Sequence, residues 1–269
     1  MRIMNRVSGA LLAAGLGLTT LMAAPAAQAA GGGEVTECTP KKQSHHERHC
    51  SFQGVFGHFD HDSALRGFEV YRNVCAGCHS LDLFAFRNLS ALGATEAEIK
   101  GVAALYEVPA IPNDEGEVLM RPALPADNYP APFPNEKAAA YANGGAIPPD
   151  LSLIVKARPG FEDHLANILT GYSDPPEGCD IPEGKYYNAY FPGYAFGMPP
   201  PLSEGAVEYN DGTEATVEQM THDVTQFLAF VAEPKLEERK QFGVKAVIFL
   251  IILTVLLYFT KKQVWRKVH

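Results

Sequence analysis

Basic side chains are scarce in this 269-residue sequence, which has 22 Lys and Arg against 31 Asp and Glu. Seven of the basic residues and none of the acidic ones lie in two end segments, residues 1–29 and 242–269. Residues 30–241 therefore carry 15 basic and 31 acidic side chains, a net charge of −16. Such a surface argues against nucleic acid as a partner and fits a basic protein partner, although it is also compatible with solubility alone.

Patterns typical of β-sheets and of repeats are absent as well. The sequence has no convincing run of alternating apolar and polar residues and no internal repeat. Its 20 prolines and 24 glycines predict long loops between a few helices. The expected fold class is therefore mainly α, a helical domain with long loop insertions. Long loops in a compact domain are usually functional, and a large flat cofactor would supply the packing surface that they lack.

Helical periodicity and capping residues predict five helices before residue 233. Two of them begin with a capping box, in which the first residue and the residue three positions later satisfy each other's backbone N–H groups. The predicted helices are 63–76, capped by Asp62 or Ser63; a helix from the Thr95/Glu98 box to Pro109; 135–144, capped by Asn135; 161–170, with Leu165, Ile168 and Leu169 inward; and 216–232, from a Thr216/Gln219 box.

The first end segment has the form of a secretory signal. Arg2 and Arg6 precede an apolar run of modest length, and the small residues Ala27–Ala29 suit a cleavage site. The run is short and rich in Gly and Ala, which disfavours the alternative of an uncleaved anchor. Residues 1–29 are therefore predicted to be a cleavable signal, and the mature chain to lie outside the cytoplasmic membrane.

The second end segment contains the long apolar run 242–260, with Lys245 as its one charge. Its length matches a helix that crosses a hydrocarbon core of ~30 Å. The tail 261–269 has four basic residues and no acid, which predicts a cytoplasmic location. The sequence thus divides into the signal, a periplasmic domain at 30–241, a transmembrane helix at 242–260 and a cytoplasmic basic tail.

Cysteine is also infrequent, with five residues, but Cys75, Cys78 and His79 form the motif C-x-x-C-H. A disulfide-exchange site would need a βαβ frame, and a structural zinc site a second Cys or His pair at matching spacing; neither is found. The motif is the attachment signature of c-type haem, in which two thiols one helical turn apart bind the vinyl carbons and the histidine ligates iron. One motif predicts one covalent haem c.

A haem iron that only transfers electrons needs a sixth ligand, and a methionine thioether would raise its potential. Three methionines lie after the signal: Met120 in a loop, Met220 on an apolar helical stripe, and Met198 in "GMPPPL". Gly197 removes bulk on one side of Met198, and three prolines stiffen the chain on the other. Met198 is therefore the predicted second axial ligand, with Met120 as the alternative.

Six ordered segments, from about Phe52 to the C-terminus, make the sequence similar to one known family. They are "RGFEVYRNVCAGCHSLD", "NGGAIPPDLSLIVKAR", "LTGY", "GKYYNAYFPGYAFGMPPPL", "YNDGTEATVEQMTHDV" and "AEPKLEERKQFG". Together they resemble the cytochrome c1 family, the haem subunits of the ubiquinol–cytochrome c oxidoreductase, or cytochrome bc1 complex. The Sec-type signal suggests a bacterial member.

The resemblance implies a cytochrome c-like helical core with loop insertions and assigns residue roles. Cys75 and Cys78 would carry the thioethers, and His79 and Met198 would be the axial ligands of the iron. Arg158 would lie near a haem propionate, with a surface salt bridge as the alternative. Further matches are Gly67 and Phe68, where the first helix crosses the last near Phe227 or Phe230, and Asn143, Ala146, Pro148 and Pro149, a loop that packs on the haem face.

The resemblance also implies partners and a location. The haem would accept an electron from the Rieske iron–sulfur protein and pass it to a soluble c-type cytochrome, beside a cytochrome b subunit and membrane lipid. The protein would be a redox subunit of ubiquinol–cytochrome c reductase that is not catalytic alone. It would sit in the bacterial inner membrane with one span, its haem domain in the periplasm and its C-terminus in the cytoplasm. Glu115 and Glu117 lie near the family's docking region.

The segment 30–51 departs from the family pattern. Cys38, Cys50 and the histidines His45, His46 and His49 crowd together there. A metal site is one interpretation, but the spacing suits zinc poorly, and a Cys38–Cys50 disulfide is the expected alternative in an oxidising compartment. Cys179 would then be left over, and sequence alone does not settle the pairing.

Two other functions remain open at this point. One is a catalytic haem enzyme, such as a peroxidase, with a vacant sixth position on the iron. The other is a stand-alone membrane-anchored monohaem cytochrome that feeds an oxidase.

Overall fold

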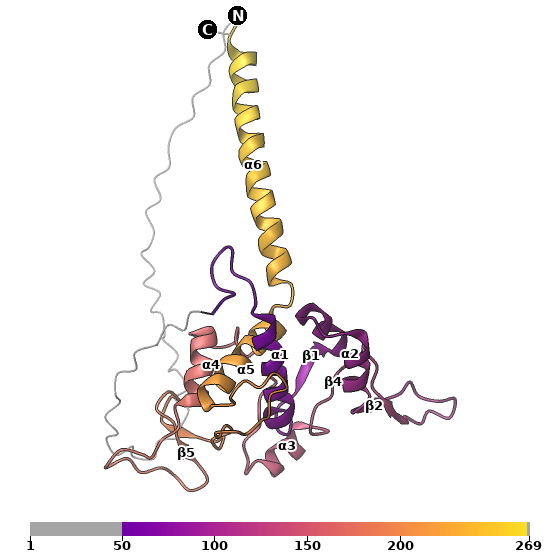
Figure 1. Cartoon of the computed structure of the whole chain (residues 1–269), viewed down its shortest axis with the longest axis vertical. Coiled ribbons are helices and arrows are strands. Elements are labelled where there is room, and N and C mark those ends of the chain that lie inside the picture. The colour runs from indigo at the N-terminus through magenta and orange to yellow at the C-terminus, as the bar shows by residue number, and fades with distance from the viewer. Residues whose placement is uncertain (1–49, 268–269) are drawn as a thin grey trace, which may run out of the picture. The chain divides into compact units, whose positions relative to one another are not determined.

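The computed structural model describes residues 50–267 of the chain, and six α-helices dominate this part (Figure 1). The mainly helical fold class with loop insertions is thereby confirmed, whereas the expected signal at 1–29 lies outside the described residues. The helices are α1 (His61–Val70), α2 (Glu96–Ala103), α3 (Glu136–Ala142), α4 (Phe161–Thr170), α5 (Val217–Ala232) and α6 (Leu236–Trp265). A π-helical turn, Tyr71–Cys75, continues α1, and a 3₁₀-helix, Phe86–Leu92, precedes α2.

Short antiparallel strand pairs lie within the loops, where the sequence predicted no strands. They are β1 (Leu81–Ala85) with β4 (Asn128–Tyr129), β2 (Glu107–Pro109) with β3 (Met120–Pro122), and β5 (Tyr186–Tyr187) with β6 (Ala195–Phe196). Segments of two to five residues are too short to show the alternation on which a strand prediction depends. They stiffen the loops without changing the helical class.

Capping residues define the starts of α2, α3 and α5 as expected. The Thr95/Glu98 capping box is present, Asn135 accepts a hydrogen bond from the N–H of Ala138, and Thr216 accepts one from the N–H of Gln219. These side chains satisfy backbone donors that a helix leaves unpaired.

Two helix boundaries and one capping contact differ from the prediction. Asp60, and not Asp62 or Ser63, caps α1. α2 ends at Ala103, before Pro109, because residues 107–109 pair with β3 instead. The prediction that the Gln219 side chain bonds back to the N–H of Thr216 is wrong. Its amide donates to the Asp223 carboxylate at 3.0 Å instead.

α1 crosses α5 at Gly67, where the two backbones approach closely. A Cβ atom built on Gly67 would lie 2.0 Å from the carbonyl oxygen of Asp223 and 2.7 Å from Cβ of Phe227. Phe68 packs beside this point, with its ring centroid 5.5 Å from that of Phe227. The expected crossing is therefore confirmed with Phe227, and only glycine fits at its centre.

A buried ion pair adjoins the crossing. The fully buried carboxylate of Asp223 accepts hydrogen bonds from Ser63 Oγ at 2.6 Å and from Arg66 Nε at 3.0 Å. Arg66 also donates to Asp211 at 2.9 Å and lies over the ring of Tyr209. Every charge removed from water here has a partner of opposite sign, so the cluster joins α1 to α5 without an uncompensated charge.

Burial alone would raise the pKa of Asp223, but hydrogen bonds from His222, Arg66, Ser63 and Gln219 hold it well below its ordinary value. A carboxyl whose pKa is lowered by folding stabilises the fold above the unfolded-state pKa of about 4. That contribution is lost as the pH falls through the folded-state value.

α6 is long and apolar enough to cross a membrane, and it contains the whole predicted span 242–260. Its most apolar window is not buried against other parts of the described chain. A soluble core helix would bury that surface, so a single membrane anchor is the role that α6 fits.

Substituting Gly67→Ala is expected to destabilise the protein by about 3 kcal/mol or to prevent folding, because neither backbone can yield to the added Cβ. Denaturant unfolding of the haem-loaded protein, followed by circular dichroism, measures this. The matched control is Gly101→Ala in α2, where an added Cβ meets nothing within 4 Å. That change is expected to be neutral or stabilising, and equal losses at both positions would contradict the close crossing.

Substituting Asp223→Asn is expected to cost about 3 kcal/mol at pH 7, because it leaves Arg66 without its buried partner. The deficit relative to the parent protein should begin to shrink below pH ~4, where the carboxyl of the unfolded parent protein takes up a proton while that of the folded protein is still ionised. Asp211→Asn is the control, since that side chain is 47% exposed and should cost below about 1 kcal/mol. Unfolding free energies at pH 7 and pH 3 test both, and a deficit that does not change with pH would contradict the assignment.

Candidate functional site

The π-helical turn at the end of α1 places the C-x-x-C-H motif. The N–H of Ala76 bonds to the carbonyl of Tyr71 at 2.8 Å, five residues back, and the N–H of His79 bonds to the carbonyl of Cys75 at 2.9 Å. The second bond closes one helical turn, which brings Cys75, Cys78 and His79 onto a single short segment. π-Turns of this kind are frequent at functional sites, and the sequence did not signal this one.

The buried ring of Tyr71 fixes this turn to the core. Its hydroxyl donates to the carbonyl of His79 at 2.9 Å, and its ring lies against Phe227 and Tyr129. Burial raises the pKa of the Tyr71 phenol, so it stays a neutral donor at physiological pH. Tyr71 was not predicted to be a site residue, although it lies one helical turn before Cys75.

Cys75 and Cys78 are thiols in the structure and form no disulfide bond. Cys78 is exposed, while burial raises the pKa of Cys75 to about 12. Thiols that exchange disulfides or bind zinc have lowered pKa values, because the thiolate is the reactive form. The buried environment of Cys75 therefore disfavours a disulfide-exchange or zinc-binding thiolate at that position.

The His79 imidazole is oriented by the loop after α3. Its Nδ1 lies 2.8 Å from the carbonyl oxygen of Pro149, and since a carbonyl only accepts, Nδ1 carries the proton and donates. Nε2 is then left with its lone pair, the form in which histidine binds a metal. Burial lowers the pKa of His79, which also favours the neutral ring.

Asp150 ties that loop to the motif. Its carboxylate accepts hydrogen bonds from Ser80 Oγ and from the N–H of Asp82, both at 2.8 Å, and from the N–H of Ser152 at 2.9 Å. Pro149 is thereby held at a constant place against His79. Asp150 was not predicted to be a site residue. Its place directly after the two prolines of "PPDLSL" could have indicated it, because that segment was expected to pack on the haem face.

Met198 follows β6 and is half-buried. Its carbonyl accepts a hydrogen bond from the Tyr172 hydroxyl at 3.0 Å, a contact that the sequence did not indicate. A Cβ on the preceding Gly197 would lie 3.5 Å from Cβ of Ala146, which belongs to the same loop as Pro149. The loop after α3 thus contacts both the His79 segment and the Met198 segment.

The other candidate methionines occupy different surroundings. Met220 is completely buried in α5, which confirms its expected role in core packing, and Met120 is 55% exposed in β3. Arg158 is exposed, and its guanidinium donates to the carbonyl of Ala157 at 3.1 Å. Its role beside a propionate stays a prediction.

Cys179 is buried and disulfide-bonded, so it is not left over. Cys38 and the histidines His45, His46 and His49 lie outside the described residues, and the expected Cys38–Cys50 bond stays untested there. Within residues 50–267, no cluster of three or more His, Cys, Asp or Glu side chains is arranged to hold a metal ion.

Comparison with known proteins places these features in one family. The model of the cytochrome C1 family matches residues 50–268. Cytochrome c1 of Rhodospirillum rubrum is 45% identical over 278 residues, which cover 97% of this chain and 98% of that protein. "Cytochrome c1, heme protein, mitochondrial" of Saccharomyces cerevisiae is 49% identical over 80% of this chain and 70% of its own length. "Cytochrome b/c1" of Bradyrhizobium diazoefficiens is 49% identical over 81% of this chain, which spans only 35% of that longer protein.

A C-x-x-C-H turn with an oriented histidine and a single apolar C-terminal helix together define a membrane-anchored c-type cytochrome. More particularly, the chain belongs to the cytochrome c1 family, the haem subunits of the bc1 complex. Its cofactor is haem c, held covalently.

Proposed function

We propose that the protein is the electron-transfer subunit of a ubiquinol–cytochrome c oxidoreductase. Its haem accepts one electron from a Rieske iron–sulfur protein and passes it to a soluble c-type cytochrome. The observation that carries the proposal is the 2.8 Å contact between His79 Nδ1 and the carbonyl of Pro149, within a chain of the cytochrome c1 family. In this role the protein is a redox subunit of the complex and is not catalytic alone.

Four side chains hold the haem in this proposal. Cys75 and Cys78 would form the thioether bonds, His79 would bind the iron through Nε2, and Met198 would supply a thioether ligand. When bound, the haem supplies one-electron transfer, and a methionine ligand raises its reduction potential. Support for Met198 comes from the Tyr172 hydrogen bond and from the shared contact with the loop after α3.

The chain's own residues then orient the ligands and exclude water. Tyr71 and Asp150 fix the His79 segment from two sides, through the His79 carbonyl and through the Pro149 loop. Arg158 pairs with a haem propionate through its exposed guanidinium. Because His79 and Met198 would both ligate the iron, no position on it would be left for a substrate, which separates this function from that of a peroxidase.

The acidic surface is proposed to guide the soluble cytochrome. Glu115 and Glu117 are exposed in the turn between β2 and β3, and their N–H groups bond to Asn113 Oδ1 at 3.1 and 2.8 Å. A turn braced in this way presents both carboxylates at the tip of a hairpin. Long-range attraction between such acids and a basic carrier raises the rate of encounter.

In the membrane, α6 anchors the protein beside a cytochrome b subunit. The name "Cytochrome b/c1" of the Bradyrhizobium relative supports that pairing. The basic residues after α6 place the C-terminus in the cytoplasm, and the haem domain then faces the periplasm of a bacterial inner membrane. Cleavage of residues 1–29 completes this arrangement.

Substituting Met198→Leu is expected to lower the haem reduction potential by on the order of 0.1 V or more, because a thioether ligand is lost. Redox titration of the purified, haem-loaded protein measures the shift. Met120→Leu is the matched control, since that exposed side chain lies in β3 and should leave the potential unchanged. A shift for Met120→Leu with none for Met198→Leu would reverse the ligand assignment.

Purification in mild detergent is expected to recover the protein together with a cytochrome b and a Rieske iron–sulfur protein, with quinol–cytochrome c reductase activity in the same fractions. Haem staining, mass spectrometry of the fractions and activity assays check this. Recovery as a lone cytochrome under conditions that keep other membrane complexes intact would instead favour the stand-alone cytochrome that feeds an oxidase.

A further inference from the structure

The loop that precedes α1 is fastened to the first turns of α6. Lys240 Nζ donates to the carbonyls of Phe52 and Gly57 at 2.5 and 3.1 Å, and Glu237 accepts a hydrogen bond from the N–H of Phe59 at 2.7 Å. Glu237 and Lys240 are three residues apart and share one face of the helix. Both ends of the loop 52–59 are therefore fastened to that face of α6.

Between these fastenings, the tip of the loop is apolar and exposed. The side chain of Val55 is 66% exposed and that of Phe56 is 83% exposed, while Phe52 and Phe59 at the loop ends are buried in the core. The two buried phenylalanines anchor the ends of the loop in the core. The apolar residues at its tip do not take part in that packing. Val55 and Phe56 are neighbours on a loop fastened at both ends and form one exposed apolar patch, and such patches mark sites of contact with a partner or a membrane.

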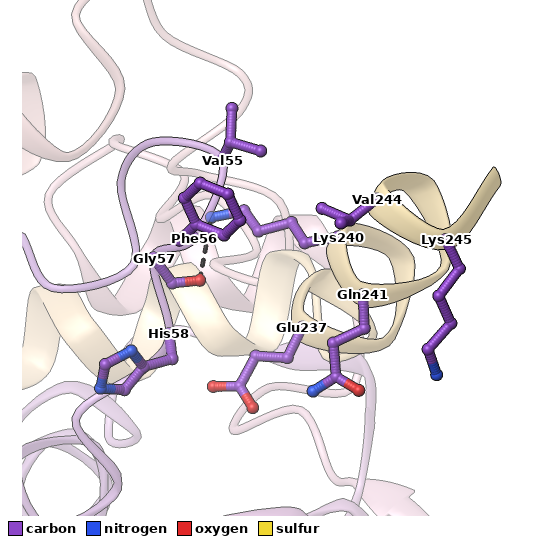
Figure 2. Close-up of a pocket in the computed structure, with 9 residues that line it drawn as sticks. All are labelled: Val55, Phe56, Gly57, His58, Glu237, Lys240, Gln241, Val244 and Lys245. Atoms are coloured by element: carbon purple, nitrogen blue, oxygen red, sulfur yellow. Dashed lines mark hydrogen bonds between the residues drawn. The ribbon is translucent and has the colours of Figure 1, made fainter. Parts of the chain in front are cut away.

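A cavity of about 470 Å³ separates this tip from α6. Val55 and Phe56 line one side of it, and Val244 and Lys245 line the other (Figure 2). In Figure 1 the same loop, drawn in indigo, stands beside the lower end of α6. Since the apolar run of α6 begins at Phe242, the loop tip is level with the first turn of the membrane span.

The charges around the cavity differ from those of the domain as a whole. Two lysines, Lys240 and Lys245, line it against one acid, Glu237, and both Lys240 and Glu237 already bond to the backbone of the loop. The predicted extramembrane segment 30–241 has a net charge of −16. The Lys245 side chain beside an aromatic tip, at the depth where a helix enters the bilayer, matches the headgroup layer, in which aromatic rings and lysines are enriched.

We propose that the loop 52–59 is a second membrane-contacting element, with Val55 and Phe56 inserted at the boundary between headgroups and acyl chains. The occupant of the cavity is a phospholipid, whose phosphate lies near Lys245 and whose chain lies along Phe56 and Val244. A single helix lets the domain rotate and tilt about its entry point, whereas a second contact restricts both motions. The inference rests on α6 as the membrane span and is independent of the route of electron transfer.

The test replaces Phe56 with the photoreactive residue p-benzoylphenylalanine in the full chain, in native membranes and loaded with haem. Illumination is expected to attach phospholipid to the peptide that contains position 56, detected as a lipid mass by mass spectrometry. Because this side chain is 83% exposed, the haem spectrum should remain that of the parent protein. An unchanged spectrum shows that the variant is folded.

Two further positions calibrate the result. Leu250→p-benzoylphenylalanine, in α6 and 55% exposed, should give the lipid adduct expected of a membrane span. Ile111→p-benzoylphenylalanine, 91% exposed between β2 and β3, is the matched apolar surface position and should give at least ten-fold less adduct than position 56.

The proposal is overturned if position 56 attaches to another polypeptide, which would identify a protein as the occupant. It is equally overturned if position 56 gives no more lipid adduct than position 111 while position 250 reacts. Loss of the adduct at position 250 would refute the membrane span on which the inference rests, whatever the outcome of the co-purification with cytochrome b.

Discussion

The close crossing of α1 and α5 at Gly67 is the constraint on which the rest of the structure depends. No side chain separates the two backbones there, and the buried pair of Arg66 and Asp223 joins the same helices one residue away. Because α1 runs without a break into the π-turn, the crossing also sets where Cys75 lies. The attachment turn is thus positioned by the core and not by the loops that surround it.

The loop after α3 is the second feature on which the placement of the proposed ligands depends. Asp150 fastens this loop to Ser80, the carbonyl of Pro149 orients His79, and Ala146 packs beside Gly197. The two segments proposed to ligate iron lie about 120 residues apart in the chain, and one short loop contacts both. Rigid ligand placement of this kind is what an electron carrier requires, because the iron should keep the same ligands in both redox states.

Local signals were sufficient for the helices and for the attachment motif. The caps at Thr95, Asn135 and Thr216 act over three residues, and the C-x-x-C-H spacing is itself one helical turn, so both are readable from sequence. The π-turn, the strand pairs and the diversion of Gln219 to Asp223 were not foreseen. The partners of the π-turn and of Gln219 are only five and four residues away, so local sequence offered those bonds without selecting them. Distant contacts made the selection: the Tyr71 ring packs on Phe227, and Arg66 of α1 holds Asp223 in place on α5.

By itself, the sequence determined the chemistry of the protein: a covalent haem, an acidic extramembrane domain and an apolar anchor, since these follow from residue types and their spacing. Only the tertiary structure decided which imidazole nitrogen of His79 is left for a metal. The carbonyl of Pro149, 70 residues away, accepts the proton of Nδ1 and leaves Nε2 without one. The tertiary structure alone also brought Phe56 beside the entry of α6, through hydrogen bonds that span more than 170 residues. Such contacts arise only when distant segments share one core.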